Sequence, residues 1–549
     1  MSCGACCSPL KPRYKRLVDN IYPDYEEEGL NNNNMQKLSY YAVTSPEKWD
    51  RIGEYLAYRI YRDLNRSYPR LNNILITSRL SHQMSLIFFV TYVYKGEVIF
   101  ILLNYVIARN GFVFIGMDAM DQLLRACQSQ HLNLYVESYL KTVQKLLESP
   151  EPDMQVRGSD SFLQFAQKEQ DVPAYHIRYD FFISKFCQMC HSETNLPNVT
   201  TKIRVSGLQG IEGVVRKIEN EELAKNIWAQ THMDKIVPSL LYNIQIGDYK
   251  KAAQGRSQTP DLGDDDHKSP LQIAEETFRK LMGRAGFMSI RAVTNPILNH
   301  LDIHQMWTPP DFAEHVFQMV MFSIQQQVNY IIIEMLMGHL EKKTDNIMVK
   351  VGITQVLSTI FSSRGVDVNV GPSVLETINA LLTHLRTSVE RAQKSRDPDP
   401  DHQRYHEALL SALGVYSSSL PYFQMIEIMM FILSKTPDQV KEDDSVNSEL
   451  QHMLLKALLT VAGKFAPVQF SNTFPPQFLL PLLDKLQSPD SDARLLVLKI
   501  FQTLIDRKTN LEKLEHPTVE PRSDLIAQIP NSNKQDNVFF EKHGDRIYR

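Results

Sequence analysis

A short cysteine and histidine motif is the first feature of this sequence that could support chemistry. Cys187, Cys190 and His191 form the pattern C-x-x-C-H, which attaches haem in other proteins and resembles half of a zinc site. The surrounding residues, YDFFISKFCQMCHS, are apolar and indicate a buried helix, and no second C-x-x-C supplies further zinc ligands. We therefore expect both cysteines to pack in the core as small hydrophobic side chains, with redox or zinc chemistry as the alternative.

Two pairs of histidines have a spacing that could hold a metal ion. His300 and His304 lie four residues apart, and so do His402 and His406, which would place each pair on one face of a helix. Neither pair belongs to an H-E-x-x-H motif. We expect surface or capping histidines, and we predict no metal site and no cofactor.

The spacing of the 22 glycines argues against the common enzyme classes. A G-x-S-x-G hydrolase turn needs glycines four apart, a dinucleotide-binding G-x-G-x-x-G needs glycines two apart, and the sequence contains neither. A phosphate-binding loop needs glycines five apart followed by lysine, but Met117 follows the only such pair, Gly111 and Gly116. We therefore predict a protein without a catalytic site.

The beginning of the chain, MSCGACCSPLKPRYKRL, combines thiols with positive charge. Three of the six cysteines lie in the first seven positions and four cations follow them: Cys3, Cys6, Cys7, Lys11, Arg13, Lys15 and Arg16. The thiols could bind zinc, remain unmodified or carry thioester-linked acyl chains. Acylation fits best, because buried acyl methylenes contribute about 0.8 kcal/mol each and cations at an anionic leaflet about 1 kcal/mol each. We predict reversible palmitoylation of the cysteines and contact of the cations with acidic phospholipids.

The composition favours a helical scaffold for these residues. Hydrophobic residues make up 43% and charged residues 22% of the 549 residues, as in an ordinary globular protein. The net charge of −4 gives no global positive field, so we predict no nucleic-acid partner. Sparse cysteines and the lack of an apolar leader predict folding in the reducing cytosol.

Apolar residues recur every three or four positions through most of the chain. Between Pro46 and Leu64 the residues on one helix face are Trp49, Ile52, Leu56, Ile60 and Leu64. Similar stripes predict helices at 130–147, 175–190, 233–246, 314–340, 373–386, 449–462 and 493–505.

One turn pattern occurs twice. Ser149-Pro150-x-x-Asp153 and Ser488-Pro489-x-x-Asp492 each precede a predicted helix, and at the same offset Phe162 matches Phe501. We expect each aspartate to cap the helix that follows it. The pattern is typical of a two-helix repeat of the HEAT or armadillo kind, in which stacked pairs bury a continuous core. We predict an all-α solenoid, a rod of helical repeats.

Three stretches interrupt the helical pattern. Residues 84–108 look apolar enough for a membrane span, but Lys95-Gly96-Glu97 divides them into two short runs rich in Val, Ile, Tyr and Phe, which predicts a short non-helical hairpin instead. Residues 250–270 and 391–403 lack an apolar period and predict loops.

Several stretches resemble the rolling blackout (Efr-three homologue) family, in order along nearly the whole chain. They are KPRYKRLVDNIYP at 11–23, YAVTSPEKWDRIGEYL at 41–56, MDAMDQLLRAC at 117–127, IRVSGLQGIEGVVRK at 203–217 and HMDKIVPSLLYN at 232–243. The resemblance implies an armadillo-like rod that is palmitoylated at its N-terminal cysteines and lies on the cytoplasmic face of the plasma membrane. It also implies partners there: anionic inner-leaflet phospholipids, phosphatidylinositol 4-kinase type III alpha, a tetratricopeptide-repeat adaptor and hyccin.

The resulting domain prediction has six parts. These are a membrane anchor at 1–20, N-terminal repeats at 36–246 with an atypical insertion at 67–110, an acidic loop at 247–270, middle repeats at 271–390, a loop at 391–404, and C-terminal repeats at 405–549. Family members continue beyond this length, so we expect the last part to be truncated. We predict a non-catalytic scaffold that recruits the kinase; the alternatives are a membrane-associated lipase and a cytosolic scaffold without lipid.

Overall fold

The computed structural model describes most of the chain, and the described part is helical. The described residues are 11–67, 111–127, 132–168, 173–194, 196–217, 227–254, 269–342, 346–362, 374–394, 400–437, 445–465 and 474–505. These ranges contain no strand, in agreement with the all-α prediction. Outside them lie Cys3, Cys6 and Cys7, the stretch predicted as a hairpin at 84–108, almost all of the predicted insertion at 67–110, and residues 506–549.

The first compact unit spans Met1–Gly371. Its first helices are α1 (Arg13–Asp19), α2 (Asn32–Thr44) and α3 (Trp49–Ser67), with the short turns η1 (Glu26–Glu28) and η2 (Pro46–Lys48), followed by a helix over residues 111–126. Then come α6 (Leu132–Glu148), α7 (Pro152–Ala166), α8 (Pro173–Cys190), α9 (Pro197–Arg216), α11 (Gln230–Gln254), α12 (Pro270–Arg284), α13 (Ile290–Ile303), α14 (Asp311–Ser323), η5 (Gln326–Val328), α15 (Asn329–Lys342) and α16 (Ile347–Ser362).

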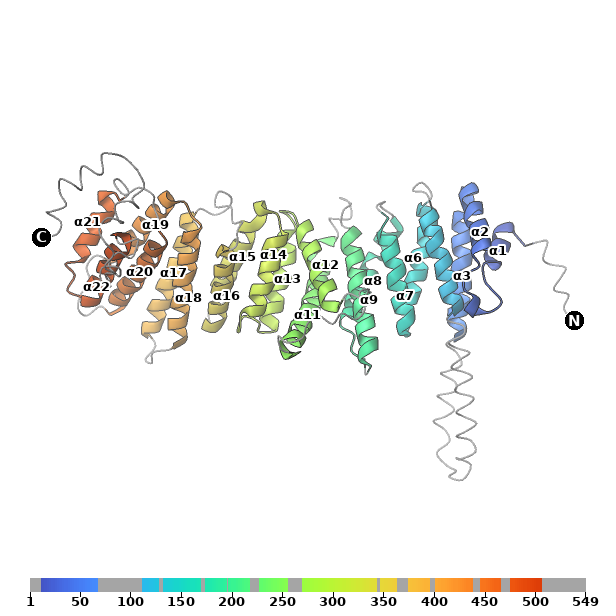
Figure 1. The fold of residues 1–549 in the computed structure, drawn as a ribbon, viewed down its shortest axis with the longest axis horizontal. Coiled ribbons are helices and arrows are strands. Elements are labelled where there is room, and N and C mark those ends of the chain that lie inside the picture. Colours follow the sequence, from blue (N-terminus) through green and yellow to red (C-terminus); the bar gives the residue numbers. More distant parts are fainter. Residues whose placement is uncertain are drawn as a thin grey trace, which may run out of the picture. The chain divides into compact units, whose positions relative to one another are not determined.

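These helices form two layers, with neighbours side by side in chain order (Figure 1). One layer contains α3, α6, α8, α11, α13 and α15, and the other contains α7, α9, α12, α14 and α16. Within a layer each helix packs on the next, and pairs such as α8 and α9 join the layers. This is the arrangement of a helical-repeat solenoid, which buries one continuous core.

The second unit, Pro372–Arg549, repeats the same packing. Its described helices are α17 (Val374–Lys394), α18 (Pro400–Ser418), α19 (Tyr422–Lys435), α20 (Ser445–Lys464), α21 (Pro476–Lys485) and α22 (Ser491–Ile505). Here α18, α20 and α22 pack in succession, while α19 packs on α20 and α21. The repeat prediction therefore holds in each unit taken by itself.

The predicted apolar stripe of α3 is buried in full. Trp49, Ile52, Leu56, Ile60 and Leu64 are all at most 8% exposed. The prediction of one helix at 314–340 is wrong, because the chain is extended at Ile324 and makes the short turn η5 before α15 begins. Periodicity missed this break because Ile324 and Val328 remain buried through it.

Helices extend into both stretches that were predicted to be loops. Residues 247–254 belong to α11, and α12 begins at Pro270 behind a capping box formed by Ser269 and Gln272. Likewise, α17 runs to Lys394 and α18 begins at Pro400. Polar helix ends carry no apolar period, so the sequence pattern could not separate them from loops.

The repeated turn has the same local structure in both copies, although the predicted caps are wrong. Ser149 Oγ accepts the backbone N–H of Glu151 at 3.2 Å, and Ser488 Oγ accepts that of Asp490 at 3.3 Å. The carbonyl of each serine also accepts a side-chain N–H from an equivalent position six residues later, in Gln155 and Arg494.

The helix that follows each turn is capped differently. Asp153 lies inside the first turn of α7, which begins at Pro152 without a side-chain cap. In the second copy Asp490, not Asp492, caps the helix, since its Oδ1 accepts the backbone N–H of Asp492 at 2.9 Å. Each aspartate predicted to cap its helix therefore lies two positions after the true N-cap residue, Glu151 or Asp490.

Cations connect successive helices of one layer through their C-terminal ends. Lys168, after α7, donates to the carbonyl of Arg125 at 3.4 Å. Lys217, after α9, donates to the carbonyl of Lys168, and Arg284, at the end of α12, donates to that of Val215. Each later cation therefore donates to a carbonyl at, or just after, the C-terminal end of an earlier helix, where a positive charge is favourable. We call this arrangement the cation series.

Candidate membrane-facing site

The predicted lipid-binding cations lie on and just before α1. This helix packs on α2 and α3, and its Val18 is fully buried. Arg13 and Arg16 are exposed, and Lys15 is half-buried. The core contact at Val18 therefore fixes a short helix whose outer surface is basic.

Asp19 holds α1 against α3. Its carboxylate accepts ion pairs from Lys11 and from Arg59 of α3, and a hydrogen bond from the Tyr55 hydroxyl at 3.1 Å. The hydrogen bond to Asp19 raises the pKa of Lys11. Lys11 is therefore partly engaged within the protein, whereas the other three predicted cations have no ion pair among the described residues.

Two of the cations lie over aromatic rings. The Arg13 guanidinium is 5.2 Å from the centre of the Tyr41 ring, and the Lys15 ammonium is 5.1 Å from the centre of the Tyr55 ring. Such contacts hold the long side chains in place while leaving their charge available. Sequence reasoning missed these partners, because periodicity does not show which surface tyrosines of α2 and α3 face α1.

The acylation prediction concerns residues outside the described ranges. Cys3, Cys6 and Cys7 precede Lys11, the first described residue, by at most eight positions. Their modification remains a prediction. Within the described part, no helix combines the length and apolar character that crossing a bilayer requires.

The two cysteines of the C-x-x-C-H motif lie in the core at the end of α8, as expected, whereas His191 follows the helix and is exposed. Cys187 and Cys190 are at most 6% exposed, and burial raises the pKa of the Cys187 thiol to about 11 and that of Cys190 well above its ordinary value. His191 pairs with Ser239 Oγ at 3.1 Å. The thiols therefore stay protonated at neutral pH, which suits packing and neither metal binding nor redox chemistry.

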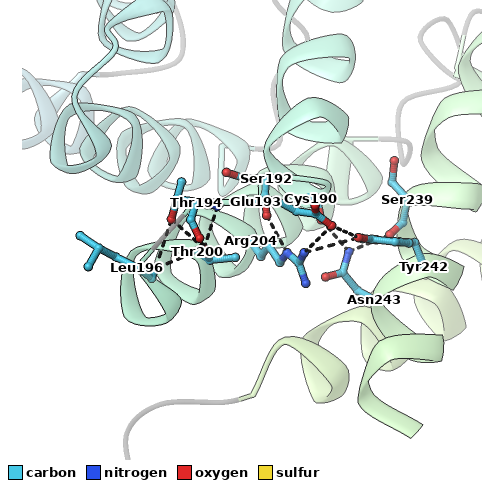
Figure 2. A network of polar contacts seen from close by, with 10 residues as sticks. All are labelled: Cys190, Ser192, Glu193, Thr194, Leu196, Thr200, Arg204, Ser239, Tyr242 and Asn243. Atoms are coloured by element: carbon cyan, nitrogen blue, oxygen red, sulfur yellow. Dashed lines mark hydrogen bonds and ion pairs between the residues drawn. The ribbon is translucent and has the colours of Figure 1, made fainter. Parts of the chain in front are cut away.

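Side chains of the next helices donate hydrogen bonds to carbonyls at the end of this motif and just after it (Figure 2). Asn243 of α11 donates to the carbonyl of Cys190 at 3.1 Å, and Arg204 of α9 donates to that of Ser192 at 2.9 Å. The Tyr242 hydroxyl donates to Glu193 at 3.0 Å beside them. This polar cluster therefore caps the C-terminal end of α8, which is a structural role.

The prediction of surface histidines is wrong for one member of each pair. His300 is 3% and His406 is 6% exposed, and burial lowers the pKa of each to about 4. The hydroxyl of Ser388 lies 3.1 Å from His402 and 3.0 Å from His406. Among the residues that the structure describes, no group of three or more His, Cys, Asp or Glu side chains could hold a metal ion.

Comparison with known proteins gives one consistent result. A family model described as "EFR3, armadillo repeat" matches residues 35–80 and 104–549. The interruption, residues 81–103, falls inside the stretch for which we expected an insertion.

Curated relatives match the chain from end to end. The zebrafish (Danio rerio) protein EFR3 homolog B is 39% identical over 568 residues, covering 100% of this chain and 64% of its own length. The Drosophila melanogaster EFR3 homolog cmp44E is 40% identical over 551 residues, covering 99% of this chain and 60% of its own length. The chain thus spans a little under two thirds of these relatives, whose names state no enzymatic activity.

A likeness to solved structures is weaker. The karyopherin Kap121p bound to RanGTP has a TM-score of 0.39 at 13% identity, covering 88% of this chain and 48% of that one.

Proposed function

Because the chain belongs to the EFR3 family, we propose that it is a non-catalytic scaffold that attaches to the cytoplasmic face of the plasma membrane through its N-terminal end. The observation that carries this proposal is the basic outer surface of α1, immediately after a cluster of three cysteines. Palmitoylation of Cys3, Cys6 and Cys7 would supply the hydrophobic part of the attachment. The cations of α1 would supply the electrostatic part.

The magnitudes support two cooperating signals. Cations near an anionic leaflet contribute about 1 kcal/mol each, so Arg13, Lys15 and Arg16 together contribute about 3 kcal/mol. One acyl chain alone gives weak, reversible attachment, whereas a chain combined with a basic patch attaches stably. The helical repeats would then present their surfaces to protein partners.

The partners in this proposal follow from the family resemblance. They are phosphatidylinositol 4-kinase type III alpha, a tetratricopeptide-repeat adaptor and hyccin, which would assemble on the scaffold to make phosphatidylinositol 4-phosphate at the inner leaflet. The deciding experiment combines fractionation with measurement of this lipid in cells that depend on the chain. Changing Cys3, Cys6 and Cys7 to Ser should release the protein from membranes, remove hydroxylamine-sensitive palmitate and lower the lipid at the plasma membrane.

A charge-reversal set tests the electrostatic part separately. Changing Arg13, Lys15 and Arg16 to Glu should abolish binding of the unacylated protein to vesicles that contain phosphatidylserine. A matched control changes three exposed cations of other helices to Glu: Lys202, Arg404 and Lys499. If the α1 variant and the control variant bind these vesicles equally well, the cations of α1 are not the lipid-binding site. A triple cysteine variant that stays on membranes would place the attachment elsewhere, and lipid hydrolysis by the purified protein would favour a lipase.

A further inference from the structure

Tyrosine rings adjoin the cations of α1 on the outer surface of the first unit. Tyr58 of α3 is 58% exposed, and its ring stacks on that of Tyr55 with the two centres 6.2 Å apart. Tyr55 contacts the ring of Tyr14 edge-on at 6.3 Å, and the ammonium of Lys15 lies 5.1 Å from its centre. We call Tyr14, Tyr55 and Tyr58 the tyrosine edge.

The tyrosine edge is separate from the hydrophobic core. The core-facing residues of α3, such as Leu56 and Ile60, are fully or almost fully buried, whereas Tyr55 is half-buried and Tyr58 is mostly exposed. A tyrosine has an apolar ring and a polar tip, and this combination favours the boundary between water and the acyl region of a bilayer. Rings exposed beside fixed cations therefore suit a lipid surface.

The charges around the edge decide which surface it fits. Arg13, Lys15 and Arg16 give it a positive border, while the carboxylate of Asp19 is engaged by ion pairs within the protein. Two exposed carboxylates of α3 oppose this charge: Glu54, one helical turn before Tyr58, and Asp50, one turn before Glu54. The border is therefore complementary to an anionic surface, and these two carboxylates act against that attraction.

We propose that the tyrosine edge is a second lipid contact, in which the ring of Tyr58 enters the headgroup region of an anionic bilayer beside the cations of α1. This inference rests on the proposed membrane attachment and deepens it. It adds a contribution to binding that salt does not screen, because ring burial is not electrostatic. It also fixes orientation, since a bilayer contacted by both Lys15 and Tyr58 must lie against α3 as well as α1.

Vesicle binding of the purified, unacylated chain tests this proposal. We expect Tyr58→Ala to weaken binding to vesicles of phosphatidylcholine and phosphatidylserine about fivefold, at low and at high salt. The matched control is Tyr249→Ala on α11, where the tyrosine is 64% exposed, and it should bind like wild type. Glu54→Gln should strengthen binding.

A fluorescent label reports insertion directly. In a chain with Cys3, Cys6 and Cys7 changed to Ser, an environment-sensitive dye placed through Tyr58→Cys should shift to shorter wavelength on these vesicles, and one placed through Tyr249→Cys should not. If the unacylated wild-type chain does not bind the vesicles at all, both the electrostatic part of the attachment and this inference fail. If it binds but Tyr58→Ala binds equally well and the dye does not shift, only the inference is overturned, and the edge then serves a protein partner.

Discussion

Gly210 of α9 lies against the Phe186 ring of α8, and its replacement by alanine tests this packing directly. A methyl group at this position would lie 2.2 to 2.5 Å from three ring atoms of Phe186. Carbon atoms in contact normally stay about 3.5–4.0 Å apart, so the ring would have to move by more than an ångström. The ring cannot easily do so, because it packs on Phe162 with centres 4.9 Å apart and on Phe182 with centres 6.0 Å apart.

The expected magnitude follows from two opposing effects. Overpacking of a filled core costs about 1–3 kcal/mol, and a contact this short belongs at the upper end. Alanine in place of glycine inside a helix returns about 0.5–1 kcal/mol. We therefore expect Gly210→Ala to lower the free energy of unfolding by about 2 kcal/mol.

Gly338 supplies the matched control. It lies inside α15, and a methyl group there would meet nothing within 4 Å. Only the helix preference then remains, so Gly338→Ala should raise the free energy of unfolding by about 0.5–1 kcal/mol. Urea unfolding followed by circular dichroism at 222 nm measures both variants.

A second substitution identifies the ring as the cause. Phe186→Ala removes the ring atoms nearest to Gly210, so adding Gly210→Ala in that background should cost much less than in the wild type. If Gly210→Ala has the same free energy of unfolding as the wild type, or costs the same in both backgrounds, the proposed clash with the Phe186 ring is refuted.

Three further predictions concern polar groups. Burial lowers the pKa of His300 to about 4 from an ordinary 6.5, so the unfolded chain takes up the proton first and stability falls as the pH drops below 6.5 towards 4. Between pH 7 and 5 this loss is about 2 kcal/mol, and His300→Leu should reduce the dependence of urea midpoints on pH, leaving the part that His406 contributes. Lys217→Met removes the donor to the carbonyl of Lys168 and should cost about 2 kcal/mol in the same assay, so an unchanged midpoint would show that this member of the cation series is dispensable. Asp490→Ala should cost about 1 kcal/mol by removing the cap of α22, whereas Asp492→Ala should be nearly neutral, and the reverse order would restore the cap predicted from sequence.

Helix positions were the most predictable feature of this chain, because the residues that form the core recur with the helical period. The stripe of α3 was assigned from Trp49 to Leu64 and is buried throughout. The same signal failed between α14 and α15, where apolar residues continue across an extended turn. It also failed at His300, since a single polar residue within an apolar stripe does not disclose whether it is buried.

The candidate site was only partly predictable. Its cations were identified from composition alone, since a run such as KPRYKR needs no fold to be recognised. Their neighbours were not, because Tyr41 and Tyr55 reach α1 only through the packing of three helices. Pairing across some forty residues, as between Asp19 and Arg59, leaves no trace in local periodicity.

The direction of the cation series has a consequence for synthesis of the chain. Every donor comes later in the sequence than the carbonyl it satisfies: Lys168 follows Arg125, Lys217 follows Lys168, and Arg284 follows Val215. As the chain leaves the ribosome, the newest helix of this layer therefore lacks these side-chain hydrogen bonds until the next pair has emerged and docked. Each helix pair is completed by a hydrogen bond from the pair that follows it. The first unit should therefore become resistant to proteolysis in steps during synthesis, with each pair protected only after the next pair has docked.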